Sequence, residues 1–309
     1  MDFKHIPVLF EESIAALNIK ADGIYVDCTA GGGGHSSAVA DRLSANGRLI
    51  AIDRDPQAIQ TLTGRFEGRE NITIVNDNFF NIKGITESLG ISGVDGILAD
   101  LGVSSHQLDD ASRGFSFHSD APLDMRMSMQ GMSAADAVNS LSQQELQKII
   151  YKFGEEKFAP RIASAIVRQR QIKPIETTLE LADIIKSAIP AAARREGGHP
   201  ARRTFQALRI YVNGELDGLS QALLDMFESL NVGGRLAVIT FHSLEDRAVK
   251  QTFASLCEGC TCPPEFPVCV CGKESRGALP QKALAPTDEE IEENPRSRSA
   301  RLRVIERKR

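Results

Sequence analysis

Strand-like and helix-like segments alternate through the first hundred residues of this 309-residue chain. Short runs rich in β-branched residues are separated by helical stretches such as residues 35–44 and the helix that Pro56 opens, a favoured first position. Four such runs occur, at residues 24–28, 48–53, 72–75 and 95–100. Because parallel strands need helical crossovers between them, this alternation predicts a parallel sheet with right-handed connections.

The alternation stops after Asp100, and residues 105–135 are predicted to form a long loop. Helical segments without strands follow, at residues 143–153, 157–170 and 179–189. Later segments are predicted as a long helical stretch, an apolar strand, a helix and a last strand, at residues 205–230, 233–241, 243–256 and 300–306. The simplest interpretation is a doubly wound α/β domain, residues 1–107 and 205–309, interrupted by an all-helical insert, residues 108–204.

The charge balance limits the functions that the chain can have. It carries 36 basic and 41 acidic residues, so the formal net charge is −5. This argues against a protein that coats nucleic acid over its whole surface, but it leaves room for a local basic surface. Residues 1–10 contain no secretory apolar segment, and no stretch reaches the roughly 18 apolar residues of a membrane helix. The protein is expected to be soluble and cytoplasmic.

The strongest local motif is the run Asp27-Cys-Thr-Ala-Gly-Gly-Gly-Gly-His35, between the first strand and the first helix. Glycines at this position let the backbone turn sharply and approach a ligand closely. Asp53, 22 residues after Gly31, ends the second strand, where a carboxylate can accept both ribose hydroxyls of an adenosine. The spacing therefore indicates an adenosine cofactor, although four glycines can also form a simple tight turn.

The glycine spacing favours a methyl donor over a dinucleotide. The dinucleotide pattern G-x-G-x-x-G does not complete, because its last position falls on Ser36 or Ser37. A methyl donor has no pyrophosphate and does not need the third glycine. An NAD-dependent oxidoreductase is therefore the weaker alternative.

Polar residues follow two further strands at the edge where ligands bind in such sheets. Asp100 ends the fourth strand, and His242 follows the late apolar strand. Either is a candidate catalytic group, although a histidine at a strand end, such as His242, is more often a simple hydrogen-bonding residue. Ser243 is a candidate N-cap for the next helix, with Asp246 as its partner. Phe79, after the third strand, either stacks on an adenine or packs in the core.

Five of the six cysteines crowd into residues 257–271, at Cys257, Cys260, Cys262, Cys269 and Cys271. In a cytoplasmic protein such a cluster suggests metal or reduced thiols before disulfides. Five cysteines can supply the four thiolates of a structural zinc, yet the C-x-C spacings are tighter than in the usual zinc knuckle. Thiols in a proline-rich loop are the alternative, both readings stay open, and no metal is assigned to the candidate active site.

Nine ordered motifs carry a resemblance to a known family. They are His5-Ile-Pro-Val-Leu9, Ala30-Gly-Gly-Gly-Gly-His35, Ala51-Ile-Asp-Arg-Asp-Pro56, Asp100-Leu-Gly-Val-Ser-Ser105, Arg113-Gly-Phe-Ser-Phe117, Leu123-Asp-Met-Arg-Met127, Phe205-Gln-Ala-Leu-Arg-Ile210, Phe241-His-Ser-Leu-Glu-Asp-Arg247 and Asn294-Pro-Arg-Ser-Arg-Ser299. With these motifs in this order, over residues 5–306, the chain resembles the MraW family of ribosomal RNA methyltransferases.

The resemblance implies a class I, Rossmann-like S-adenosylmethionine methyltransferase fold with an inserted all-helical subdomain that recognises the substrate. It implies N4-methylation of one cytidine in the decoding region of the small-subunit (16S) ribosomal RNA, with the assembled small subunit as the expected partner. By position it maps the contacts of S-adenosylmethionine onto Gly33, Gly34, His35, Asp53, Phe79, Asp100 and Gln107.

Several points stay open from the sequence. Asp100 is the candidate acid or acceptor at the target amine, and His242 or Phe115 are candidates for orienting the base. Phosphate contacts are expected from basic residues of the insert and the Arg-rich tail, namely Arg194, Arg195, Arg202, Arg203 and residues 296–309. The alternatives are a methyltransferase-fold RNA-binding or ribosome-assembly factor, and a methyltransferase that acts on DNA or protein.

Overall fold

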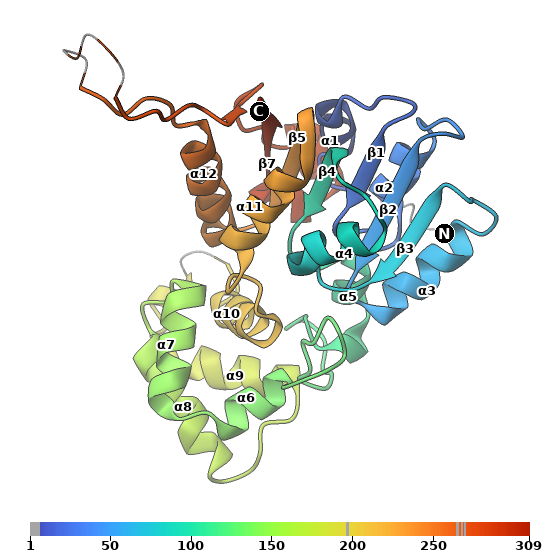
Figure 1. Cartoon of the computed structure of the whole chain (residues 1–309). Coiled ribbons are helices and arrows are strands. Elements are labelled where there is room, and N and C mark those ends of the chain that lie inside the picture. Colours follow the sequence, from blue (N-terminus) through green and yellow to red (C-terminus); the bar gives the residue numbers. More distant parts are fainter. Residues whose placement is uncertain (1–6, 196–197, 264–265, 267, 269) are drawn as a thin grey trace. The chain divides into compact units, whose positions relative to one another are not determined.

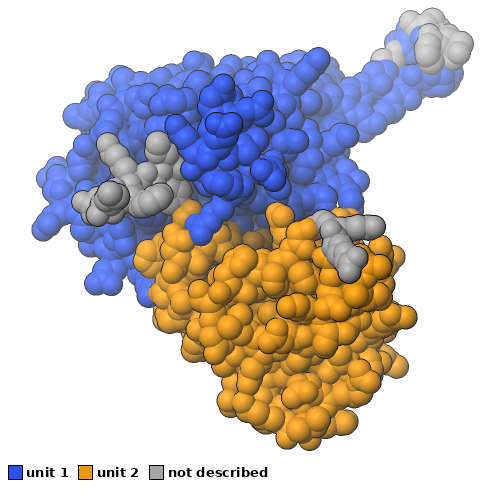
Figure 2. Space-filling model, turned by 180° about the vertical axis from the view of Figure 1, so that it is seen from behind, with its two compact units in different colours: residues 1–102, 218–309 blue, residues 103–217 orange. Residues whose placement is uncertain are grey.

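A computed structural model of the chain describes residues 7–195, 198–263, 266, 268 and 270–309. The chain forms two compact units, which Figure 2 shows in different colours. Unit 1 comprises residues 1–102 and 218–309, and unit 2 comprises residues 103–217. The chain therefore leaves unit 1 after the fourth strand and returns to it before the fifth. This confirms a helical insertion between these two strands.

Unit 1 contains a seven-stranded sheet in the order β3-β2-β1-β4-β5-β7-β6. Strands β1 to β5 are parallel to one another, and β7 runs antiparallel to both β5 and β6. The strands are β1 Ile24–Asp27, β2 Arg48–Asp53, β3 Ile72–Asn76, β4 Val94–Asp100, β5 Leu230–Thr240, β6 Gly277–Ala278 and β7 Arg301–Arg307. Because β1 lies between β2 and β4, the ends of these strands meet at one edge (Figure 1).

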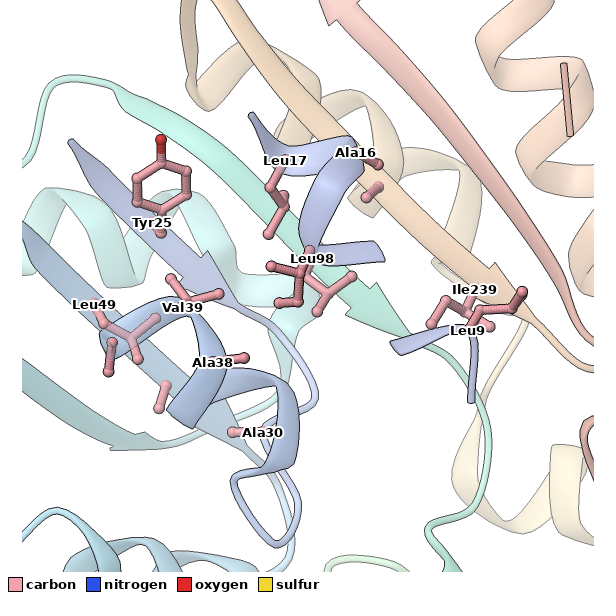
Figure 3. Packing of buried hydrophobic residues seen from close by; sticks show 14 of the residues in the cluster. Leu9, Ala16, Leu17, Tyr25, Ala30, Ala38, Val39, Leu49, Leu98 and Ile239 are labelled. Atoms are coloured by element: carbon pink, nitrogen blue, oxygen red, sulfur yellow. The ribbon is translucent and has the colours of Figure 1, made fainter. Parts of the chain in front are cut away.

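Helices cover both faces of this sheet, since neighbouring side chains of a strand point to opposite faces. One face carries α1 Phe10–Leu17, α2 Gly34–Ala40 and α3 Pro56–Arg65. The other carries α4 Ile82–Ser88, α11 Leu219–Ser229 and α12 Ser243–Cys257. The first face encloses a core that includes Leu17, Val39, Leu49 and Leu98 (Figure 3). Strand β2 is apolar almost throughout, as expected for a strand buried on both faces.

Three shorter helical segments complete unit 1: η1 Phe79–Asn81, α13 Asp288–Glu293 and η4 Pro295–Ser299. Helix α13 contains all five acids of the acidic run at residues 288–293. The Glu290 carboxylate accepts the backbone N–H of Leu9 at 2.7 Å. The acidic run thus helps to hold the start of α1, where Leu9 has a left-handed backbone conformation.

Unit 2 is helical and has its own apolar core, built from residues such as Leu146, Ile162 and Leu208. Its elements are α5 Ser105–Asp109, η2 Ala111–Arg113, α6 Ala134–Ser140, α7 Gln143–Gly154, α8 Ala159–Arg170, α9 Thr178–Ala188, η3 Ala193–Arg195 and α10 Arg202–Asn213. The apolar residues of α7 and α8 recur at helical spacing, which buries one side of each helix.

Most of the predicted elements are confirmed, and three are corrected. The loop predicted at residues 105–135 contains the short helix α5, because Ser104 and Gln107 form a capping box that starts a helix there. The helical stretch predicted at 205–230 is two helices, since Gly214 adopts φ 60° and ends α10. The N-cap of α12 is His242 and not Ser243.

The compact units also divide the chain at other residues than predicted, at 102/103 and 217/218 instead of 107/108 and 204/205. The main difference is α10, which packs against α7 inside unit 2. The Gln206 side chain donates to the carbonyl of Phe153 at 3.1 Å. A Cβ added at Gly154 would lie 2.6 Å from the Arg203 carbonyl oxygen, so the two helices approach closely there.

None of the helices formed by the described residues has the length and apolar character needed to span a bilayer.

Candidate functional site

The glycine turn after β1 opens toward solvent at its centre. Gly31 has φ 50° and Gly33 has φ 81°, which is a left-handed conformation that glycine adopts without strain. Around a Cβ added at Gly32, no atom lies within 4 Å among the described residues, so a ligand can approach the backbone there. Gly34 is different, because an added Cβ would lie 2.5 Å from Pro7 Cγ. Gly34 thus serves the packing of the N-terminal segment on α2.

Asp53, at the end of β2, is tied to this turn. One carboxylate oxygen accepts the backbone N–H of Gly31 at 2.8 Å, and the other accepts that of Asp55 at 2.8 Å. Burial raises the pKa of Asp53 above its usual value, although these two hydrogen bonds oppose the rise. The structure therefore brings the glycine turn and the acid together, as the spacing predicted.

Asp27, the last residue of β1, is a buried carboxyl beneath the turn. It accepts the Ser36 hydroxyl at 2.6 Å and the Thr29 backbone N–H at 3.1 Å. Burial raises the pKa of Asp27 to about 6, and the nearby Asp53 carboxylate adds to the rise. Asp27 holds the turn to the start of α2, and its charge lies close to the candidate cofactor site.

Asp100, the last residue of β4, lies next to the end of β1 because the two strands are paired. Its backbone N–H donates to the Thr29 hydroxyl at 2.7 Å, and its carboxylate lies 4.0 Å from Nδ1 of His35. One carboxylate oxygen, Oδ1, is buried and has no hydrogen-bond partner within the described part of the chain. A quarter of the side chain is nevertheless exposed, so the group borders an accessible space.

The environment of Asp100 disfavours its charge. Burial is the main cause, and the carboxylates of Asp27 and Glu245 add like-charge repulsion. Together they raise the pKa of Asp100 to about 8. A carboxyl with a pKa of about 8 is mostly protonated at neutral pH. At the ligand-binding edge of a sheet, such a group is a candidate for proton transfer or for binding a cation.

His242 follows β5 and caps α12. Its Nδ1 atom accepts the backbone N–H of Glu245 at 3.3 Å, so this lone pair is already used by the helix. Its Nε2 atom lies 3.1 Å from a carboxylate oxygen of Glu245, whose other oxygen accepts the Phe241 backbone N–H at 2.9 Å. The structure thus places His242 and Glu245 together at the end of β5, with the imidazole in a helix-capping role.

His35 and Phe79 lie in the helical segments that follow β1 and β3. His35 is buried in the first turn of α2, and its ring centroid lies 5.6 Å from that of Phe10. Phe79 is half-buried in η1 and meets Phe80 edge-on at 4.9 Å. A Cβ added at Gly218 would lie 3.1 Å from Phe80, so Phe80 packs closely against the residue that precedes α11.

Gln107 belongs to unit 2, whereas the other residues of the predicted cofactor site belong to unit 1. Its side-chain amide oxygen accepts the Ser104 backbone N–H at 3.0 Å, and its backbone N–H donates to the Ser104 hydroxyl. Its side chain is buried and has a structural role in the capping box of α5. Phe115, the candidate aromatic for orienting the base, is buried in the core of the same unit.

The sequence reasoning missed two carboxyls, Asp27 and Glu245, as functional candidates. Asp27 was visible as the residue that precedes the glycine turn, at the end of a strand. Glu245 gave no local signal, because only the pairing of β4 with β5 brings the segment after β5 toward Asp100.

The basic residues predicted for phosphate binding divide into two groups. In the C-terminal tail, Arg303 forms a two-pronged ion pair with Asp246, and Arg307 donates to main-chain carbonyls. These guanidinium groups stabilise unit 1. In unit 2, Arg202 and Arg203 are exposed at the start of α10. The Arg195 side chain lies outside the described residues.

The sheet order, the crossovers, the antiparallel β7 and the glycine turn beside an acid at the end of β2 define a class I, Rossmann-like methyltransferase fold. The profile of the MraW methylase family matches residues 2–308. The chain belongs to the MraW methylase family.

Curated relatives match over nearly their full length. Ribosomal RNA small subunit methyltransferase H of Brevibacillus brevis is 53% identical over 310 residues, which is 99% of each chain. The protein of the same name from Clostridium botulinum strain Kyoto is 56% identical over 306 residues, covering 98% of this chain and 99% of the relative. That from Lachnospira eligens is 55% identical over 310 residues, covering 99% and 98%.

Proposed function

We propose that this protein transfers a methyl group from S-adenosylmethionine to the exocyclic N4 of one cytidine in the decoding region of 16S ribosomal RNA. One observation carries the proposal beyond family membership. At the carboxyl edge of the sheet, the turn at Gly32 is open and three aspartates with raised pKa values, Asp27, Asp53 and Asp100, surround it. Such a site is built for an adenosine ligand that carries positive charge.

The charge of the site favours S-adenosylmethionine over a dinucleotide as the cofactor. A dinucleotide brings an anionic pyrophosphate to the glycine turn, where the buried Asp27 would repel it. S-adenosylmethionine instead brings a sulfonium cation, which offsets the repulsion among the carboxylates. The unpartnered buried oxygen of Asp100 fits the same conclusion, because a cationic neighbour stabilises its ionised form.

The residues of the turn and of the strand ends are assigned roles in holding the cofactor. Asp53 accepts the ribose hydroxyls, as carboxylates at the end of the second strand do in adenosine sites. Phe79 lies beside the adenine. Gly33, Gly34 and His35 shape the turn and the start of α2, and Asp100 faces the charged end. Gln107, in unit 2, forms the capping box of α5, and its contact with the cofactor stays a prediction from the family motifs.

The reaction needs positioning more than it needs a strong base. The cofactor supplies an electrophilic methyl group, and the cytosine amine is a weak nucleophile because its lone pair is conjugated with the ring. Asp100 in its ionised form accepts a hydrogen bond from the amine, which helps the nitrogen to become pyramidal, and then takes the proton. Alignment of amine and methyl group supplies much of the remaining rate.

His242 is assigned a positioning role next to this centre. Its imidazole caps α12 and lies against Glu245, whose carboxylate is one of the charges that act on Asp100. His242 therefore influences the protonation of Asp100 through Glu245. A direct role as a base would require its capping lone pair to be released.

Unit 2 is assigned the recognition of RNA. Phe117 and His199 stack with ring centroids 4.5 Å apart and an interplanar angle of 11°, and His118 lies 4.5 Å from Phe117. Burial and the neighbouring His118 lower the pKa of His199, which favours a neutral ring. Unpaired RNA bases stack on such aromatic groups, and the exposed Arg202 and Arg203 supply phosphate contacts.

The proposed setting is the cytoplasm, with the assembled small subunit as the substrate. The test is a methyl-transfer assay with labelled S-adenosylmethionine on small subunits that lack the modification, and on free 16S RNA. Nucleosides of the digested RNA are then identified. The expected product is N4-methylcytidine, formed on subunits by the wild-type protein and lost in Asp53→Asn.

Two outcomes of this assay would contradict the proposal. Label in DNA or protein substrates with none in RNA would indicate a different acceptor. Tight binding to the subunit with no transfer to any acceptor would indicate an assembly factor that keeps the methyltransferase fold. Phe117→Ala tests the insert in the same assay, with an increase of roughly tenfold in KM expected from the loss of one stacked base.

A further inference from the structure

The described residues between α12 and β6, which are residues 258–263, 266, 268 and 270–276, are called the arm, and Figure 1 shows it running out from the end of α12. Its base is held by the Arg276 N–H, which donates to the Leu256 carbonyl at 3.0 Å, and by the ion pair of Lys273 with Glu258 at 2.6 Å. None of the described side chains of the arm is buried. A hydrophobic core therefore does not hold the described part of this arm.

Three cysteines of the arm converge in space. The sulfur atoms of Cys260, Cys262 and Cys271 all lie within 4.8 Å of one another. The Sγ atoms of Cys260 and Cys271 are 3.6 Å apart. This separation is far from the roughly 2.05 Å of a disulfide bond. It is close to the edge of about 3.8 Å that four sulfurs form around a zinc ion at a bond length near 2.3 Å.

Backbone N–H groups point at each of these sulfurs. Cys260 accepts the N–H of Cys262 at 3.4 Å, and Cys262 accepts that of Val270 at 3.3 Å. Cys271 accepts the N–H of Lys273 at 3.4 Å, across Gly272 with φ 61°. A neutral thiol is a weak acceptor, whereas a thiolate is a good one. The backbone is thus arranged to stabilise negative sulfur, as the outer shell of a metal site does.

We infer that Cys260, Cys262 and Cys271 bind a structural zinc ion. Three thiolates this close repel one another unless a divalent cation lies between them. Sulfur ligands in a tetrahedral arrangement select zinc among the common divalent ions. Three sulfur ligands leave one tetrahedral position for a further ligand. Cys269 lies outside the described residues.

Cys257 does not belong to the site. It is half-buried in the last turn of α12, and the group of neighbouring sulfurs among the described residues does not include it. Burial raises the pKa of its thiol, which opposes the deprotonation that metal binding requires. The zinc ion thus cross-links the arm, which lacks a core in its described part, as metals do in small folds.

The test measures the metal content of the untagged, full-length protein by plasma mass spectrometry. The wild-type protein is expected to carry about one zinc ion per chain. Cys260→Ser and Cys271→Ser are expected to lower the zinc content or affinity roughly tenfold or more. Cys257→Ser is the matched control, since it removes one thiol from the same region, and it keeps the wild-type zinc content. Circular dichroism establishes that each variant is folded.

A second readout is spectroscopic and does not depend on activity. Cobalt substituted for zinc is expected to show the intense visible absorption of tetrahedral thiolate coordination, and Cys271→Ser removes it. Folded wild-type protein without zinc would overturn the inference. Zinc retained equally in all three variants, or iron in its place, would overturn it as well.

Discussion

The carboxyls at the helix starts of unit 2 and those at the strand ends of unit 1 are used in opposite ways. In unit 2, four helices begin with capping boxes, whose side chains satisfy the first backbone N–H groups. Three of the partners are acids, and hydrogen bonding lowers the pKa of each: Asp136, Glu145 and Glu180, the last to about 2. In unit 1, Asp27 and Asp100 end strands, and burial raises their pKa values to about 6 and 8.

The difference separates stability from function. Each charged carboxylate of the capping boxes stabilises the fold that holds it. The charges of Asp27 and Asp100 instead destabilise the empty unit 1, because burial and their neighbours disfavour ionisation. Carboxyls whose ionisation destabilises the empty protein indicate a ligand that stabilises their charged form. Here the proposed ligand is a cation.

The largest expected effect comes from removing a strand-end charge. Asp53→Asn is expected to weaken the binding of S-adenosylmethionine on the order of 100-fold, since two charge-assisted hydrogen bonds to the ribose are lost. Isothermal titration calorimetry measures the affinity. The matched control is Glu180→Gln in unit 2, which removes a capping charge and leaves the affinity unchanged. Equal affinity of wild type and Asp53→Asn would contradict the assignment of the cofactor site.

A second prediction concerns pH. The pKa of Asp100 lies near 8 in the folded protein and near 3.8 in the unfolded chain. Its protonated form therefore stabilises the fold below about pH 4, and this stability is lost as the pH rises through about 8. Glu180 behaves oppositely: its contribution is present above about pH 4.5 and is lost as the pH falls through about 2.

Urea unfolding without cofactor tests this sign. The free energy of unfolding of Asp100→Asn, relative to wild type, is expected to increase between about pH 5 and about pH 8. Over this range the wild type alone loses stability, because its buried carboxyl ionises more readily in the unfolded chain. Glu180→Gln should differ from wild type by a constant amount over the same range. A difference for Asp100→Asn that does not change with pH would show that the carboxyl is well solvated.

The smallest expected effect is in unit 2. The Thr177 hydroxyl accepts the N–H of Glu180 at the start of α9. Thr177→Ala is expected to lower the free energy of unfolding by about 1 kcal/mol, with cofactor affinity unchanged. Thr177→Ser keeps the cap and is expected to recover most of this loss. Denaturant unfolding of both variants checks the prediction. A loss of cofactor affinity in Thr177→Ala would contradict the expectation that this cap affects stability alone.

Some features of this protein follow from the sequence alone. The alternation of strands and helices, the glycine turn, the acid at the end of β2 and the helical insert all come from local patterns. These patterns depend on residues a few positions apart, where backbone preference and periodicity act directly. The nine family motifs added the methyltransferase class, because they stand in a fixed order along the chain.

Other features exist only in the tertiary structure. Asp27, Asp100 and Glu245 are far apart in the sequence, and they act on one another because β1 pairs with β4 and β4 pairs with β5. Their raised pKa values depend on burial, which no local pattern encodes. Likewise the sequence predicted Ser243 as a helix cap, whereas the contact with Glu245 selects His242. Local chemistry determined which residues are present, and the order of the strands decided which of them meet.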